Sequence, residues 1–198
     1  MAKVIKLTIS TPEKFGPQRV RTKKNTALEK HGQLNLFTGG KVVKLNQLSA
    51  FEEALMFDER VDVSASKTLY LQAIEKGDAP ADAYCNLGII EFKEGNTTKA
   101  IDYFTMSLKH DPRHFEAHYN LANAYSEVGN LALAKIHYNV SIEIEPSFCN
   151  SYFNLGLTLA MNKELPEAIQ ILHHYRNLSP SCEHPATDEL ISKLTEHE

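Results

Sequence analysis

Histidine and cysteine are the side chains of this sequence best suited to binding a metal ion or to starting nucleophilic chemistry. Three pairs of them stand close together: His114 with His118, His173 with His174, and Cys182 with His184. A metal site needs several Cys, His or carboxylate ligands at regular spacing, and no further ligand flanks these pairs in that way. We therefore expect structural or surface roles for them and predict no metal site.

The sequence also lacks the short motifs of common catalytic sites. It contains no GxGxxG, no phosphate-binding GxxxxGK and no GxSxG. The polar segment KKNTALEKHGQ offers no organised nucleophile and base. We predict a protein that is not an enzyme, with no catalytic residue and no cofactor.

Composition predicts a globular protein without a membrane segment. The chain has 198 residues, of which 42% are hydrophobic, enough to form a core. No run approaches the roughly 18 apolar residues of a membrane helix, and the start MAKVIKLTISTPEKF lacks the apolar centre of a secretory signal. The three cysteines are odd in number and widely spaced, which argues against a disulfide framework. We expect a cytoplasmic location.

Charge divides the chain into a basic arm and an acidic body. Residues 1–46 contain ten Lys or Arg and two Asp or Glu, a net charge of +8. Residues 47–198 contain the other eleven basic and twenty-three acidic side chains, a net charge of −12, and the two sum to −4. This asymmetry indicates that the arm contacts a polyanion such as nucleic acid, or folds back on the body.

From Ala81 onward the sequence repeats itself every 34 residues, over 81–114, 115–148 and 149–182. Four positions match across the copies: Leu87, Leu121 and Leu155; Gly88, Ala122 and Gly156; Ala100, Ala134 and Ala168; Pro112, Pro146 and Pro180. Apolar residues recur at helical spacing on both sides of a polar break, EGNTT, VGNLA or NKELP. Each copy is therefore predicted to form two antiparallel helices, which the small residues allow to approach closely.

The helical pattern extends beyond the three copies in both directions. Residues 47–80 match the repeat at its small and aromatic positions, among them Ala54, Tyr70 and Ala73, and form a degenerate first repeat. Ser49 with Glu52 three residues later predicts a capping box at the start of its first helix. After Pro180, the segment PATDELISKLTEH predicts a short amphipathic helix with Thr187 or Asp188 near its start. Such a helix would cover the apolar end of the last repeat.

The succession of NLG, alanine, an aromatic residue and DP or EP resembles the tetratricopeptide repeat family, over residues 81–182. The resemblance implies an all-α solenoid of helix pairs in residues 47–182, closed by a capping helix in 183–198 and preceded by a largely irregular basic arm in 1–46. Three departures stand out: Tyr84, His118 and Tyr152 where the family often has tryptophan, Glu91 in place of an aromatic residue, and Tyr175 in place of a small one.

In the family that this chain resembles, the first helix of each pair lines a concave groove that binds peptides. Transferred position by position, the resemblance predicts these groove residues: Asn86, Ile89, Phe92, Lys93, Tyr119, Asn120, Asn123, Phe153, Asn154 and Leu157. Asparagine recurs at the sixth position of all three copies, where its amide can pair with the backbone of an extended peptide. The alternative is that these asparagines serve local hydrogen bonding or packing.

The predicted groove is poor in positive charge. Some family members hold the C-terminal carboxylate of chaperones through several lysines, arginines and asparagines, whereas Lys93 is the only base at the groove positions here. An apolar or basic segment is therefore the better candidate ligand. Some of the apolar groove residues can instead belong to the core, because a stripe at helical spacing usually packs.

The arm contains a short motif of its own, QLNLF at residues 33–37. It resembles the peptide by which many bacterial proteins bind the replication sliding clamp, and the four informative positions are Gln33, Leu34, Leu36 and Phe37. Basic neighbours are candidates for phosphate contacts with nucleic acid: Arg19, Arg21, Lys23 and Lys24. Alternatively, LNLF packs along the acidic solenoid or with the short apolar stretches of the arm.

Three hypotheses for function follow. The first is a non-enzymatic scaffold that binds a peptide or partner protein in the groove. The second is a DNA-associated adaptor whose arm contacts nucleic acid or the sliding clamp. The third is self-association through arm and groove. None of them involves a membrane.

Overall fold

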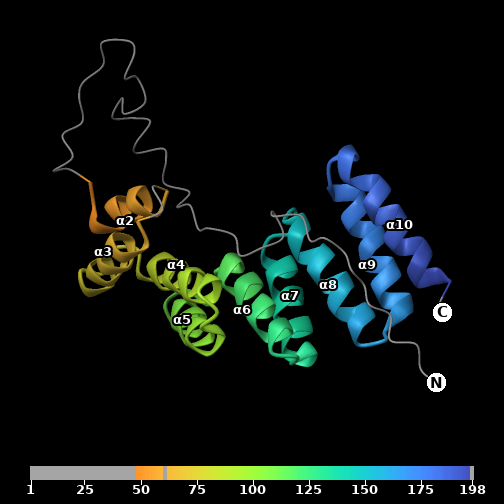
Figure 1. Ribbon diagram of the computed structural model, residues 1–198, viewed down its shortest axis with the longest axis horizontal. Coiled ribbons are helices and arrows are strands. Elements are labelled where there is room, and N and C mark those ends of the chain that lie inside the picture. Colours follow the sequence, from red (N-terminus) through yellow and green to blue (C-terminus); the bar gives the residue numbers. More distant parts are fainter. Residues whose placement is uncertain (1–47, 60–61, 197–198) are drawn as a thin grey trace, which may run out of the picture.

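The computed structural model describes residues 48–59 and 62–196 (Figure 1). This part of the chain contains nine α-helices and no β-strand, so the all-α prediction is confirmed. The helices are α2 (Ala50–Glu59), α3 (Val63–Glu75), α4 (Pro80–Lys93), α5 (Thr97–His110), α6 (Phe115–Glu127), α7 (Leu131–Ile144), α8 (Cys149–Met161), α9 (Leu165–Leu178) and α10 (His184–Thr195). A short 3-10 helix, η3 (Ser181–Glu183), precedes α10.

The helices pair in chain order and the pairs stack in a row (Figure 1). Contacts join α2 with α3, α4 with α5, α6 with α7 and α8 with α9, and each second helix also contacts the first helix of the next pair. The first helices touch one another as well, α4 with α6 and α6 with α8. The predicted helix-pair solenoid is therefore the observed architecture.

Small residues allow the two helices of a pair to approach closely. A Cβ atom built on Gly88 would lie 2.5 Å from the Phe104 ring, and one on Gly156 would lie 2.7 Å from Leu172. Neither distance is compatible with ordinary van der Waals contact, so each glycine makes room for the large side chain of the partner helix.

The turns within the pairs use a left-handed residue at equivalent positions. Gly95 has φ +81° and Gly129 has φ +78°, values that glycine adopts without steric cost. In the third repeat Lys163 takes this position with φ +65°. The polar breaks predicted from the sequence therefore share one backbone conformation.

The first helix pair has the predicted capping box. The Glu52 N–H donates to Ser49 Oγ at 3.2 Å, and the Ser49 N–H donates to Glu52 Oε2 at 2.9 Å. Asp78, which replaces the closing proline, accepts a 2.9 Å hydrogen bond from the Phe51 N–H at the start of α2. This carboxylate ties the end of the first pair to its beginning.

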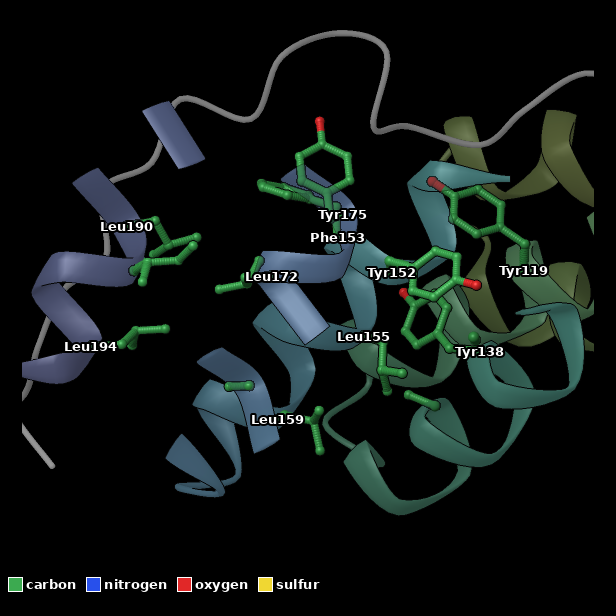
Figure 2. Packing of buried hydrophobic residues seen from close by; sticks show 14 residues of the cluster. Tyr119, Tyr138, Tyr152, Phe153, Leu155, Leu159, Leu172, Tyr175, Leu190 and Leu194 are labelled. Atoms are coloured by element: carbon green, nitrogen blue, oxygen red, sulfur yellow. The ribbon is translucent and has the colours of Figure 1, made fainter. Parts of the chain in front are cut away.

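Buried side chains form a core between the helix layers, and Figure 2 shows its C-terminal part. Leu155 and Leu159 of α8 face Leu172 of α9, and Leu190 and Leu194 of α10 pack beyond them. Helix α10 thus covers the apolar side of α9. It begins at His184, so Thr187 lies within its first turn and donates to the Glu183 carbonyl oxygen at 3.0 Å.

Candidate functional site

The predicted groove residues lie on three successive first helices. Helix α4 carries Asn86, Ile89, Phe92 and Lys93, helix α6 carries Tyr119, Asn120 and Asn123, and helix α8 carries Phe153, Asn154 and Leu157. We call the surface defined by these ten residues the first-helix face. Because α4 contacts α6 and α6 contacts α8, residues from neighbouring repeats meet on this face.

Exposure divides the first-helix face into two sets. The buried set comprises Asn86, Ile89, Tyr119, Asn120 and Phe153. The half-buried residues are Phe92, Asn123, Asn154 and Leu157, and Lys93 is exposed. In this conformation only the second set is accessible at the surface, and the buried set lies beneath it.

Asn123 is the centre of a hydrogen-bond network that joins α6, α7 and α8. Its Oδ1 accepts from the Tyr138 hydroxyl at 2.6 Å and from Asn154 Nδ2 at 2.8 Å. Asn154 Nδ2 also donates to Tyr119 Oη at 3.0 Å. In this arrangement Tyr138 and Asn154 are the donors and Asn123 Oδ1 is the acceptor that they share.

The nitrogen of the Asn123 side-chain amide lacks a hydrogen-bond acceptor. Its Nδ2 is buried, and the residues that the structure describes supply no hydrogen-bond partner for it. A buried N–H group without an acceptor costs about 1–3 kcal/mol. Asn123 therefore carries a buried donor that the network around Tyr138 and Asn154 leaves without an acceptor.

The other asparagines of the predicted ladder differ in their surroundings. Asn120 Nδ2 lies 3.7 Å from Cys85 Sγ, a weak contact that joins α6 to α4. Asn154 takes part in the network described above, and Asn86 is buried in α4. Local hydrogen bonding therefore engages at least two of the three amides.

The hydroxyls and the thiol near this network are protonated. Burial raises the pKa of Tyr119 and of Tyr138 well above the usual range, so both phenols can donate hydrogen bonds at neutral pH. Burial likewise raises the pKa of the Cys85 thiol. A thiol in this state is a poor nucleophile.

Acidic side chains outnumber basic ones at the positions that define the predicted groove. In the family that this chain resembles, positions two, five, six, nine, twelve and thirteen of each repeat face the groove. In the complete repeats, three carboxylates stand at such positions: Asp82, Glu116 and Glu127. One repeat of 34 residues earlier, the equivalent positions on α2 carry Glu52, Asp58 and Glu59. Against these six carboxylates stands Lys93. The surroundings of the first-helix face therefore favour a cationic or neutral ligand over an anionic one.

His114 connects two of these carboxylates. Its Nε2 lies 3.0 Å from Asp82 Oδ1 on α4, and its Nδ1 lies 3.2 Å from Glu116 Oε2 on α6. Burial by itself would lower the pKa of His114, but hydrogen bonds with the two carboxylates outweigh it and raise the pKa to about 9. The ring is therefore charged at neutral pH, and both nitrogens donate to carboxylates. Its Nδ1 can accept the Ala117 N–H, 3.3 Å away, only when the ring is neutral.

His118 pairs with His137, which is far from it in sequence. The two Nδ1 atoms are 2.9 Å apart, and His118 Nε2 lies 3.2 Å from the Pro112 carbonyl oxygen. Because His118 Nε2 donates to that carbonyl, its Nδ1 is the acceptor and His137 carries the shared proton. Burial lowers the pKa of both rings, that of His137 to about 4, so the pair is neutral at pH 7. The spacing of His114 and His118 in the sequence thus does not correspond to a joint site.

Glu91 forms a charged cluster on the N-terminal side of the array. It is buried in α4 and receives Lys67 of α3 and Lys99 of α5 at 2.9 Å each. Asn96 Nδ2 donates to it at 3.0 Å. Burial raises the pKa of Glu91, but these three donors outweigh burial and lower the pKa to about 2. Sequence reasoning missed this cluster, although the carboxylate in place of an aromatic residue was its signal.

Metal-binding constellations are absent from the described ranges 48–59 and 62–196: no three His, Cys, Asp or Glu side chains come together there.

Within the part of the chain seen in the structure, no helix combines the length and apolarity needed to cross a membrane.

The predictions for the N-terminal arm concern residues outside the described part of the chain. They cover the arm itself, residues 1–46; the motif residues Gln33, Leu34, Leu36 and Phe37; and the basic residues Arg19, Arg21, Lys23 and Lys24. They stay predictions from the sequence.

Models of the tetratricopeptide repeat match the chain over residues 81–114, 103–136 and 137–170. Among curated proteins, the chain is similar to Tetratricopeptide repeat protein 8 of Mus musculus, with 27% identity over 127 residues that make up 64% of this chain and 24% of that protein. It is also similar to the Protein O-mannosyl-transferase TMTC3 of Homo sapiens, with 35% identity over 108 residues, 52% of this chain and 12% of that one. The matched region spans less than a quarter of either relative.

Two solved structures share the fold. The first TPR of Spaghetti (RPAP3), bound to the HSP90 peptide SRMEEVD, aligns with 59% of this chain and 91% of that one, with a TM-score of 0.56 and 23% identity. The TPR2B domain of yeast Sti1, in a complex with pHsp70, aligns with 60% of this chain and 98% of that one, with a TM-score of 0.57 and 20% identity.

Proposed function

Because this chain is a tetratricopeptide repeat protein, we propose that it is a non-enzymatic scaffold whose first-helix face binds an extended segment of a partner protein. The solved relatives are domains of the same fold in complex with chaperone segments, which supports peptide binding as the general role. The cytoplasm is the compartment that we propose for this scaffold.

One observation carries the proposal: the Asn123 Nδ2 donor. It is buried beside the network around Tyr138 and Asn154, and the described residues supply no acceptor for it. The backbone carbonyl of an extended peptide is an acceptor that every sequence provides. A peptide carbonyl reaches this buried nitrogen only after neighbouring side chains move aside, and the hydrogen bond would then remove the cost of the unmet donor.

The charges around the first-helix face indicate which segments bind. A peptide such as SRMEEVD, which the Spaghetti domain binds, brings two glutamates, an aspartate and a terminal carboxylate. Here it would meet the exposed carboxylates Glu127 and Glu59, with Lys93 as the cation at the groove positions. Like charges repel and unmatched carboxylates lose their hydration. We therefore propose a ligand that is basic or neutral, with apolar side chains that pack on Phe92 and Leu157.

Selection from a random peptide library displayed on phage, with the full chain as bait, tests this proposal. Selected peptides are then labelled and titrated by fluorescence anisotropy against the parent chain, Asn123→Asp and Asn139→Asp. Asn123→Asp retains an oxygen that accepts from Tyr138 and Asn154, but it replaces the free donor by an acceptor. Asn139→Asp adds the same charge at an exposed position of α7 and is the matched control.

We expect selected peptides enriched in Lys, Arg and apolar residues. Asn123→Asp should weaken their binding at least tenfold, about 1.4 kcal/mol, because a carbonyl would then face a carboxylate. Asn139→Asp should leave binding within a factor of two or so. Equal affinities for all three chains, or a library that yields only acidic peptides, would contradict the proposal.

A further inference from the structure

We propose that residues 19–37 of the chain's own N-terminal arm occupy the first-helix face of the same molecule and compete with the partner for it. This inference rests on the proposed function, since it names the first ligand of the same surface. It makes the arm an internal competitor, so that a partner must displace it.

Charge complementarity is the first argument. Between Arg19 and Phe37 the arm carries five basic side chains, Arg19, Arg21, Lys23, Lys24 and Lys30, against the single acid Glu29, a net charge of +4. The groove positions of α2, α4 and α6 carry six carboxylates and one lysine. With His114 charged between Asp82 and Glu116, the sum on these positions is −4. The arm thus matches the sign and the magnitude of the charge that it would meet.

Apolar and polar composition gives the second argument. The end of the segment, GQLNLF, provides Leu34, Leu36 and Phe37. The C-terminal part of the first-helix face offers the half-buried Leu157 and, at its edge, Met161, of which 56% is exposed. The basic part of the segment and its apolar part therefore meet surfaces of matching character on α2 to α6 and on α8.

The position of the arm in the chain gives the third argument. Phe37 is eleven residues before Leu48, the residue that leads into α2. Eleven extended residues span up to about 36 Å, whereas packed helices are about 8–10 Å apart. The connecting segment can therefore reach from α2 along the row of first helices to α8. A segment tethered this closely competes at an effective concentration in the millimolar range.

Photo-cross-linking in the full chain tests the inference. The photoreactive residue p-benzoylphenylalanine replaces Phe37, the sample is irradiated, and mass spectrometry identifies the product and the peptides that it joins. We expect cross-links within one chain, to peptides of α6 or α8, at a yield that does not depend on protein concentration. Cross-links between two chains, cross-links to other helices, or none at all would overturn the inference.

Two charge variants sharpen this test. Glu127→Lys reverses a carboxylate at the end of α6 on the predicted groove, and Glu143→Lys makes the same change at an exposed position of α7. We expect the yield to fall severalfold with Glu127→Lys and to stay unchanged with Glu143→Lys. Equal yields from the two variants would show that groove charge does not hold the arm.

The library-selected peptides separate failure of this inference from failure of the proposed function. Added in excess, they should abolish the cross-link if arm and partner share the first-helix face. Peptide binding that depends on Asn123 without any cross-link would overturn the inference and leave the proposed function intact. Absence of both peptide binding and the cross-link would overturn both.

Discussion

Two junctions between neighbouring helix pairs of this solenoid have opposite chemistry. At the N-terminal junction, around Glu91, helices α3, α4 and α5 are joined by a buried carboxylate and two lysines. At the C-terminal junction, around Asn123, helices α6, α7 and α8 are joined by two amides and two phenols that carry no charge. The repeat thus determines how helices stack, while the polar group at each junction determines how the junction responds to pH and to ligands.

The difference also separates stability from binding. The carboxylate of Glu91 receives hydrogen bonds or ion pairs from Lys67, Lys99 and Asn96, and its pKa of about 2 keeps it charged at physiological pH. At Asn123 a donor is left over, and this junction is the one that we propose as the ligand site. A charged cluster whose groups are hydrogen-bonded to one another stabilises the packing of helices. A neutral network with an unpaired donor is better suited to binding a ligand.

The largest expected effect comes from removing both cations of the N-terminal junction. Lys67→Met with Lys99→Met would leave the Glu91 carboxylate buried without a charged partner, and we expect a loss of about 3–5 kcal/mol in the free energy of unfolding. Urea denaturation followed by circular dichroism measures it. Adding Glu91→Leu should restore most of the loss, because an apolar side chain needs no partner there. A loss below about 1 kcal/mol would show that the junction is not held by charge.

A smaller effect is expected from pH, through His114, which lies between the two junctions. Its pKa is about 9 in the folded chain and 6.5 in the unfolded one. A raised pKa stabilises the fold fully below pH 6.5, and this stabilisation is lost as pH rises toward 9. At ~1.4 kcal/mol per pKa unit the loss is roughly 3 kcal/mol at most. Unfolding free energies at pH 6 and pH 9 check it.

Two variants isolate the contribution of His114. His114→Asn does not titrate in this range and should show a much smaller difference between the two pH values. His110→Asn, at an exposed position of α5, should behave as the parent chain does. An unchanged pH dependence in His114→Asn would contradict the assignment.

The smallest effect is expected at the C-terminal junction. Tyr138→Phe removes the hydroxyl that donates to Asn123 Oδ1 and should cost about 1 kcal/mol, with the same value at pH 6 and pH 9 because the network is neutral. Tyr103→Phe is the matched control, since the described residues supply no hydrogen-bond partner for its hydroxyl. A strongly pH-dependent cost of Tyr138→Phe would remove the contrast between the junctions.

Much of the architecture was predictable because its causes are local or periodic. The 34-residue period, the glycines opposite Phe104 and Leu172 and the Ser49–Glu52 box all depend on residues within one helix or one pair. These features do not depend on the exact way in which neighbouring helix pairs stack. The helices, their pairing and the closing helix followed from them.

The site was less predictable. The family resemblance placed Asn123 and Asn154 on the first helices, but it gave no indication that the two amides bond to each other or that one donor remains free. His118 was considered beside His114 because the two are close in sequence, whereas its partner in the fold is His137. These pairings depend on side chains from different helices.

The sequence by itself therefore determined that this chain is a stack of helix pairs, and which residues lie on the first-helix face. Only the tertiary structure decided the partners of Glu91, His114 and Asn123. Some of these partners lie in the same repeat, whereas Lys67, Glu116 and Asn154 come from a neighbouring repeat. The physical reason is the distance along the chain over which each interaction acts. Helical periodicity follows from short-range sterics and hydrogen bonds along the chain, whereas a side-chain hydrogen bond forms only when packing brings two atoms to within about 3 Å.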